Sequence, residues 1–299
     1  MSALPILIRR NTKLFFKDKG MFFTSLITPM ILLVLYVSFL GNVYRDSFFA
    51  SFPEQTILPE ELINGFVGGQ LISSLLAVSC VTVSFCSNML MVQDKANGSI
   101  RDLTISPVKG STLAVSYYFA TMISTLLICF AAALICLFYV ANIGWYLRAA
   151  DVACLILDIF LLVMFGTALS SIIGFFMSTQ GQISAVGSSV SSCYGFICGA
   201  YMPISSFSPS LQKVISFLPG TYGTALIRNH AMGGVFAEMQ NLGISSEIIT
   251  AIQDGTDCNL YFFGNAVSIG NMYLIIGLTV AVLLAIYILI NSLHRKKKN

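Results

Sequence analysis

Five long runs without an acidic or basic side chain limit the fold of this chain more than any other feature. They are Gly20–Tyr44, Leu62–Gln93, Gly110–Leu147, Ile159–Gln212 and Cys258–Leu293. A helix needs about 20 mostly apolar residues to cross the hydrocarbon core of a bilayer, and a charge within it is costly. The fourth run is long enough for part of one span and all of another.

These runs predict an all-α integral membrane protein with six transmembrane helices. Only 10% of the residues are charged, against about 25% in soluble domains, and the mean hydropathy is +0.84. The expected single transmembrane domain fills residues 1–299. Its spans lie near 21–41, 63–90, 112–140, 149–177, 183–203 and 268–293.

The distribution of basic residues predicts the orientation. With the N-terminus inside, twelve of the sixteen Lys and Arg residues fall in inner segments, including the basic tail at 294–299. Positive charge collects on the cytoplasmic side of membrane proteins. We therefore expect a multi-pass protein of the plasma (cytoplasmic) membrane with both termini in the cytoplasm.

Residues 1–20 predict an amphipathic helix lying in the inner membrane interface. At helical spacing Leu7 and Phe15 fall on one side, and Arg10 and Lys13 fall on the other. Such a helix places its basic face toward anionic lipid headgroups. The alternative is a plain cytoplasmic anchor.

The largest segment between spans, residues 204–267, is expected on the outer side. Its stretch Val214–Ile227 is apolar but too short to span, and Pro219, Gly220 and Gly223 interrupt it. Backbone that breaks at membrane depth is tolerated where protein or a water-filled cavity shields it. We expect a re-entrant hairpin or an interfacial helix there.

The sequence contains none of the common catalytic or metal-binding patterns. It has no P-loop and no GxSxG motif, and neither His230 nor His294 has a ligand at metal spacing. The eight cysteines form no CxxC pair. No basic patch is interleaved with aromatic residues. We expect no enzyme activity, no bound metal or cofactor, and no nucleic-acid partner.

The predicted inner loop at residues 93–108 has the pattern of a short, capped helix. Gly98 allows a turn, Ser99 and Asp102 resemble a capping box, and Pro107 ends the helix. The segment is either a structured connector or an element that a cytoplasmic partner pushes.

Two sets of residues resemble motifs of the permease subunits of type-2 ABC exporters. The first set lies in the inner loop, and the second follows the fifth predicted span. Their members are Asp94, Gly98, Ser99, Asp102, Leu103, Ser106 and Pro107, then Gly199, Pro203, Leu211, Ile215, Leu218, Pro219 and Tyr222.

The resemblance implies a mechanism for nearly the whole chain. Two permeases, identical or paralogous, pair around a central path. A separate P-loop ATPase, which holds ATP and Mg, docks on residues 94–107 and on the N-terminal helix. The cargo is then amphipathic, such as a drug, lipid, peptide or envelope precursor. The chain departs from the pattern where Asp94 replaces the more usual glutamate and where the outer segment 231–265 is longer.

Small residues recur along two predicted spans. Gly187, Ser191, Gly195 and Gly199 repeat every four residues in the fifth span, and Gly65 and Gly69 begin a similar face in the second. Small residues allow helices to approach closely. These faces serve either packing within one protomer, or a dimer seam or translocation path.

Asp158 is the one acidic residue expected deep within a span. Carboxylates in membranes are expensive and often functional. Asp158 either binds a cation or proton or forms a structural hydrogen bond. Two other functions therefore stay open: an ion-coupled secondary transporter using Asp158, and a non-transporting sensor or immunity protein.

Overall fold

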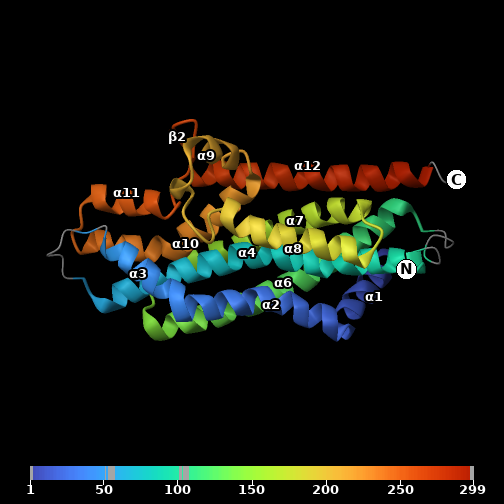
Figure 1. Ribbon diagram of the computed structural model, residues 1–299, viewed down its shortest axis with the longest axis horizontal. Helices are drawn as coiled ribbons and strands as arrows, with labels where there is room; N and C mark the ends of the chain where they lie inside the picture. The colour runs from blue at the N-terminus through green and yellow to red at the C-terminus, as the bar shows by residue number, and fades with distance from the viewer. Residues whose placement is uncertain (1–2, 51, 53–57, 101–102, 104–107, 297–299) are drawn as a thin grey trace.

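The computed structural model describes residues 3–50, 52, 58–100, 103 and 108–296, and nearly all of them are helical. Figure 1 shows an elongated helical bundle. Its first part contains α1 (Ala3–Lys17), α2 (Lys19–Leu35), the π-helical turn η1 (Tyr36–Leu40), α3 (Gly41–Phe49), α4 (Glu60–Ala96), α6 (Gly110–Ile143) and α7 (Ala149–Phe176). Its second part contains α8 (Gln180–Ile197), the 3₁₀ turn η2 (Ile204–Ser206), α9 (Pro209–Ile215), α10 (Pro219–Asn241), α11 (Ser246–Gly255), the hairpin β1 (Tyr261–Phe262) and β2 (Asn265–Ala266), and α12 (Ile269–Lys296).

Five helical segments in the described part are long and apolar enough to cross a membrane. They are Lys19–Phe49, Glu60–Ala96, Gly110–Ile143, Ala149–Phe176 and Ile269–Leu293. They correspond to the first four predicted spans and the last. The fifth predicted span at 183–203 is not among them, because α8 contains five serines and two glutamines and ends at Ile197.

The first membrane helix is longer than the sequence indicated. The expected boundary at residue 41 is wrong, because η1 leads directly into α3 and the helical segment continues to Phe49. Arg45 in α3 makes an ion pair with Glu60 at the start of α4, at 3.4 Å.

The long helix α4 forms the centre of the bundle. Nearly all of its apolar residues are buried. The apolar residues of the peripheral segments Lys19–Phe49 and Ile269–Leu293 are mostly not buried. At 1.5 Å per residue its 37 residues extend about 55 Å, well beyond a hydrocarbon core of about 30 Å. Helices α2, α6, α7, α8 and α10 all pack against it.

Polar side chains join α4 to α7 inside the bundle. The Asn88 side-chain amide donates to the Ser170 carbonyl at 2.6 Å, and the hydroxyls of Ser84 and Thr167 lie 3.4 Å apart. Gly166 allows the close approach, since a Cβ there would lie 3.0 Å from the Cys80 carbonyl oxygen. Small and hydroxylated residues hold helices together where lipid supplies no hydrophobic force between them.

The N-terminal helix is amphipathic, as predicted. Leu7 and Phe15 are buried against the bundle, whereas Arg9 and Lys13 are exposed. Asp18 then caps α2 by accepting from the Met21 amide at 3.1 Å. Helix α1 packs on α6 at the end of the bundle that holds both termini.

Pro219 begins a helix rather than interrupting one. It occupies the first turn of α10, where its missing N–H costs nothing, and α10 continues through Gly220 and Gly223 for 23 residues. The helix packs against α4, α7 and α12. The expected break is present just before Pro219, where the chain leaves α9 after Ile215 and starts α10, whereas the expected interruptions at Gly220 and Gly223 are wrong. Helix α11 follows α10, and the Ser245 side chain caps it by accepting from the Ile248 amide.

The two ends of the bundle hold different parts of the chain. In Figure 1 both chain termini and the turn between α4 and α6 lie at one end, while α11 and the far end of α10 lie at the other, here called the distal end. Helix α8 starts at the end with the termini, and α10 leads away to the distal end.

The close contact of α10 with the α6–α7 connection gives a first prediction. A Cβ at Gly234 would clash with the backbone carbonyl of Tyr146, which cannot move independently. We expect Gly234→Ala to destabilise the protein by about 1–3 kcal/mol through overpacking. Thermal unfolding in detergent measures this. The control Gly277→Ala lies within α12 in open space, and an equal loss in both variants would contradict the prediction.

Candidate functional site

Asp94 lies inside the bundle at the end of α4 rather than in a loop. Helix α4 continues to Ala96, and Asp94 is 7% exposed. Its Oδ2 accepts from Arg10 Nη1 at 2.7 Å and from the Tyr117 hydroxyl at 2.5 Å. One carboxylate oxygen therefore joins α1, α4 and α6, and we call Arg10, Asp94 and Tyr117 the Asp94 joint.

The Asp94 joint keeps Arg10 charged. Burial alone lowers the pKa of Arg10, but the hydrogen bond and negative charge of Asp94 outweigh it and raise this pKa above its ordinary value. Charge-assisted hydrogen bonds of this kind are stronger than neutral ones.

Lys95 ties the same turn to a fourth helix. Its ammonium donates to the carbonyls of Gly174 at 2.9 Å and Phe175 at 2.7 Å, and it lies 5.1 Å from the centre of the Phe175 ring. A cation at a helix C-terminus satisfies unpaired carbonyls and favours the helix dipole. Residues 94 and 95 therefore connect the inner turn to α1, α6 and α7.

In the turn after α4, the described residues have the conformation that the sequence predicted. Gly98 has a φ of +79° with open space around it, and Ser99 and Ile100 are helical. Leu103 packs against the core. Asp102, Ser106 and Pro107 lie outside the described residues, so the capping box between Ser99 and Asp102 stays a prediction.

The small residues of α4 face neighbours in the same protomer. A Cβ at Gly65 would lie 2.6 Å from Tyr146, and one at Gly69 would lie 2.8 Å from Met232 in α10. These two glycines therefore allow the α6–α7 connection and α10 to lie against α4.

Three of the four small residues of the predicted fifth span recur at four-residue spacing within α8, and the fourth lies beyond its end. Gly187 lies near Phe85 of α4, Gly195 packs directly on Tyr201, and Ser191 is half-buried. Gly199 lies beyond the end of the helix with a φ of +72°. A role of this face in pairing or transport stays a prediction.

Asp158 is fully buried and has two partners that the sequence did not indicate. Its Oδ2 lies 2.6 Å from His230 Nδ1, and its Oδ1 accepts from the Tyr273 hydroxyl at 2.6 Å. The cluster joins α7, α10 and α12. Seventy-two residues separate Asp158 from His230, and no local pattern marks the pair.

A second carboxylate, Asp151, lies two turns earlier in α7. Asp151 itself is held by Arg148, whose Nε lies 3.0 Å from its Oδ2. In the described residues no group of three or more His, Cys, Asp or Glu side chains is arranged to hold a metal ion.

Arg228 forms a second buried cluster, at the distal side. It is 2% exposed and donates to the carbonyls of Gly199 at 2.6 Å and Thr256 at 2.7 Å. It also pairs with Asp257 at 3.3 Å, and Asp257 in turn accepts from the Ile204 amide. Burial raises the pKa of Asp257, and Arg228 and the amide partly offset that rise. No local sequence pattern marks Arg228 as a buried residue.

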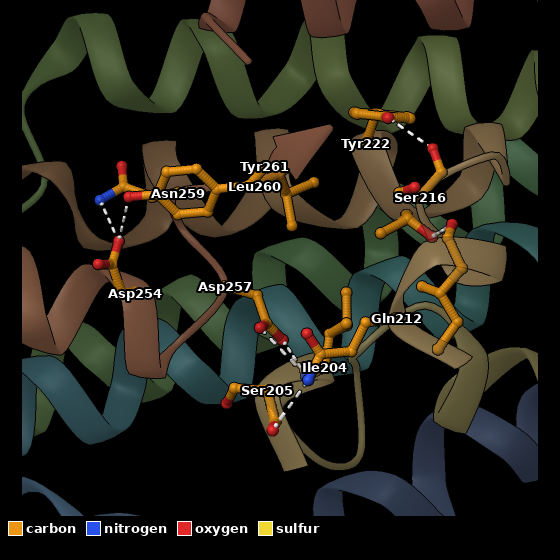
Figure 2. A pocket seen from close by; sticks show the side chains of 12 residues that line it. Ile204, Ser205, Gln212, Ser216, Tyr222, Asp254, Asp257, Asn259, Leu260 and Tyr261 are labelled. Atoms are coloured by element: carbon orange, nitrogen blue, oxygen red, sulfur yellow. Dashed lines mark hydrogen bonds between the residues drawn. The ribbon is translucent and has the colours of Figure 1, made fainter. Parts of the chain in front are cut away.

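The segment after α8 lines a small pocket of about 210 Å³, shown in Figure 2, together with residues that follow α11. Tyr222 fixes one side by donating to the Ser216 carbonyl at 2.6 Å. Asp254 accepts from Asn259 and Tyr261 on the other side. Pro203 lies just before this pocket, at the start of η2. The second motif therefore folds the chain between α8 and α10.

A bundle of long apolar helices with an amphipathic N-terminal helix defines a multi-pass membrane protein. The model of the family described as ABC-2 type transporter matches residues 2–230. The chain belongs to this family and is therefore a membrane subunit of an ABC transporter, as the resemblance indicated. No curated protein sequence matches it.

The Asp94 joint gives a second prediction. We expect Asp94→Asn to lower stability by about 1–3 kcal/mol, because the charged Arg10 then meets a neutral amide oxygen in place of a carboxylate. The loss should shrink in an Arg10→Gln background, in a double-mutant cycle measured by thermal unfolding. Asp46→Asn, at an exposed site of α3, is the control. Additive effects of Asp94→Asn and Arg10→Gln would show that the pair contributes no stability.

Proposed function

We propose that this chain is the permease of an ABC exporter and is driven by a separate P-loop ATPase that docks at the inner turn. The observation that supports this proposal is the Asp94 joint. It lies just before the Gly98 turn and connects that turn to α1, and the resemblance assigns ATPase docking to these two elements.

The connections of the inner turn support a lever role. A force applied to residues 94–107 reaches α1 and α6 through the Asp94 joint and α7 through Lys95. Closure of two ATPase subunits with bound ATP and Mg would move these helices together. The hydrolysis chemistry then belongs to the partner, since this sequence has no P-loop.

We further propose that both termini are cytoplasmic and that α8 and α10 together make the sixth crossing. Five apolar segments alone would leave the termini on opposite sides, whereas Figure 1 places both at one end. With 18 residues, α8 extends about 27 Å and covers part of the path across the membrane. Helix α10 continues this path. Helices α4, α7 and α12 pack against α10 along this path and shield it from lipid.

The cargo and the pairing follow from the family resemblance. We propose that two copies, or this chain and a paralogue, pair around an export path for an amphipathic cargo. The exposed face of α8 supports this, because Ser184, Ser188 and Ser192 would otherwise face lipid.

Docking is tested by co-purification with a matched glycine control. Gly98 and Gly243 have nearly the same φ, +79° and +77°, and both have open space around them. They follow α4 and α10, whose last turns lie at opposite ends of the bundle. A side chain costs similar backbone strain at either position. We expect Gly98→Val to reduce the amount of P-loop ATPase recovered with the tagged chain about tenfold, and Gly243→Val to leave it unchanged. Mass spectrometry quantifies the partner, and full recovery with Gly98→Val would reject this docking site.

The ion-coupled alternative is tested at Asp158. Because His230 and Tyr273 already occupy both carboxylate oxygens, we expect Asp158 to be structural. The chain alone in liposomes should then show no proton flux with a pH-sensitive dye. Asp158→Asn should keep the ATPase activity of the reconstituted complex within about twofold, a difference of less than about 0.5 kcal/mol. Proton flux that Asp158→Asn abolishes would favour the secondary transporter.

A further inference from the structure

The distal end holds a cavity of about 390 Å³, here called the distal cavity. Its described lining comes from η1, α3, α4, α10, α11 and the segment that follows α8. The volume falls in the range of about 300–1,000 Å³ that is typical of small-molecule sites. It is separate from the Asp94 joint and from the pocket of Figure 2.

One part of the distal cavity is apolar and rigid. Phe48 and Phe66 form its aromatic wall, with ring centroids 4.2 Å apart and side chains almost fully buried. Leu40, Val43 and Ile252 extend this wall. Such a surface fits the body of an apolar molecule.

Gln70 supplies an unpaired amide to the distal cavity. The residue is 2% exposed and lines the cavity. Its backbone carbonyl accepts from the Ser73 hydroxyl, but its side-chain amide makes no hydrogen bond with the described residues. Gln70 therefore offers a donor and an acceptor to a molecule within the cavity.

Arg228 adds a donor without adding net charge. Of its five N–H groups, the two on Nη1 bond Thr256 and Asp257, one on Nη2 bonds Gly199, and Nε lies 3.5 Å from the Ser73 hydroxyl. One Nη2 N–H has no partner in the described part of the chain. Because Asp257 already balances the charge, this donor suits a neutral oxygen better than a free anion.

We propose that the distal cavity binds an amphipathic molecule through an uncharged carbonyl or hydroxyl group. The oxygen accepts from Arg228 and Gln70, and the apolar body lies against Phe48 and Phe66. An ester lipid of the outer leaflet and a free neutral amphiphile share this chemistry. The inference does not depend on ATPase docking, because binding is measured on the chain alone.

The experiment uses two photoreactive probes on the full chain in nanodiscs. One is a phosphatidylcholine with a diazirine in its acyl chain, and the other is a water-added N-alkyl acetamide with the same group. Mass spectrometry then locates cross-links. We expect labelling of peptides that contain Phe48, Phe66 or Ile252. The lipid probe reports a lipid source, and the amide probe reports a free amphiphile.

Two variants on α11 distinguish the cavity from the general lipid-facing surface. Ala251 lines the cavity at an exposed position, whereas Thr250 is exposed next to it but does not line it. We expect Ala251→Trp to reduce cavity labelling at least about tenfold and Thr250→Trp to leave it unchanged. Equal effects of both variants, or no cavity labelling by either probe, would overturn the proposal.

Gln70→Leu separates a binding role from a structural one. Removing an unpaired buried amide should keep or raise the melting temperature of the unliganded chain. The apparent affinity for whichever probe labels the cavity should fall about fivefold, which corresponds to the loss of one hydrogen bond. Unchanged affinity would overturn the assigned role of Gln70, and a lowered melting temperature would show that its role is structural.

Discussion

Hydrocarbon offers no hydrogen-bond partner, and the arrangement of polar residues in this protein follows from that constraint. Asp94, Asp158 and Arg228 are buried, and each meets an opposite charge, a carbonyl or a hydroxyl from a distant part of the chain. Asp94 meets Arg10 and Tyr117, and Asp158 meets His230 and Tyr273. Each polar cluster therefore fixes helices that are distant in sequence, whereas the apolar surface between them packs with less specificity.

The central helix α4 links the distal cavity to the Asp94 joint. Gln70 and Ser73 lie toward its distal side, and Asp94 and Lys95 lie in its last turn. The 24 residues from Gln70 to Asp94 extend about 36 Å along one continuous helix without proline. A tilt imposed at one end is thus transmitted to the other without a hinge between them.

The sequence was sufficient to predict the long apolar helices but not the buried polar clusters that join them. Uncharged runs revealed the five apolar segments, and the spacing of Leu7 and Phe15 revealed the amphipathic helix. The limits of α3 and α8 were missed because a π-helical turn lets the chain continue past Gly41 and a left-handed residue at Gly199 stops it early. Asp94 was assigned to a loop because helix ends beyond the apolar run leave no mark in hydropathy. The partnership of Asp158 with His230 arises only when α10 folds back against α7.

The composition of α8 has a consequence for how the protein is made. Its serines and glutamines make it a poor substrate for insertion into lipid on its own. Its main neighbour, α4, has already been synthesised when α8 leaves the ribosome. The long helix α4 therefore offers α8 a protein surface to pack on as it folds, in place of lipid.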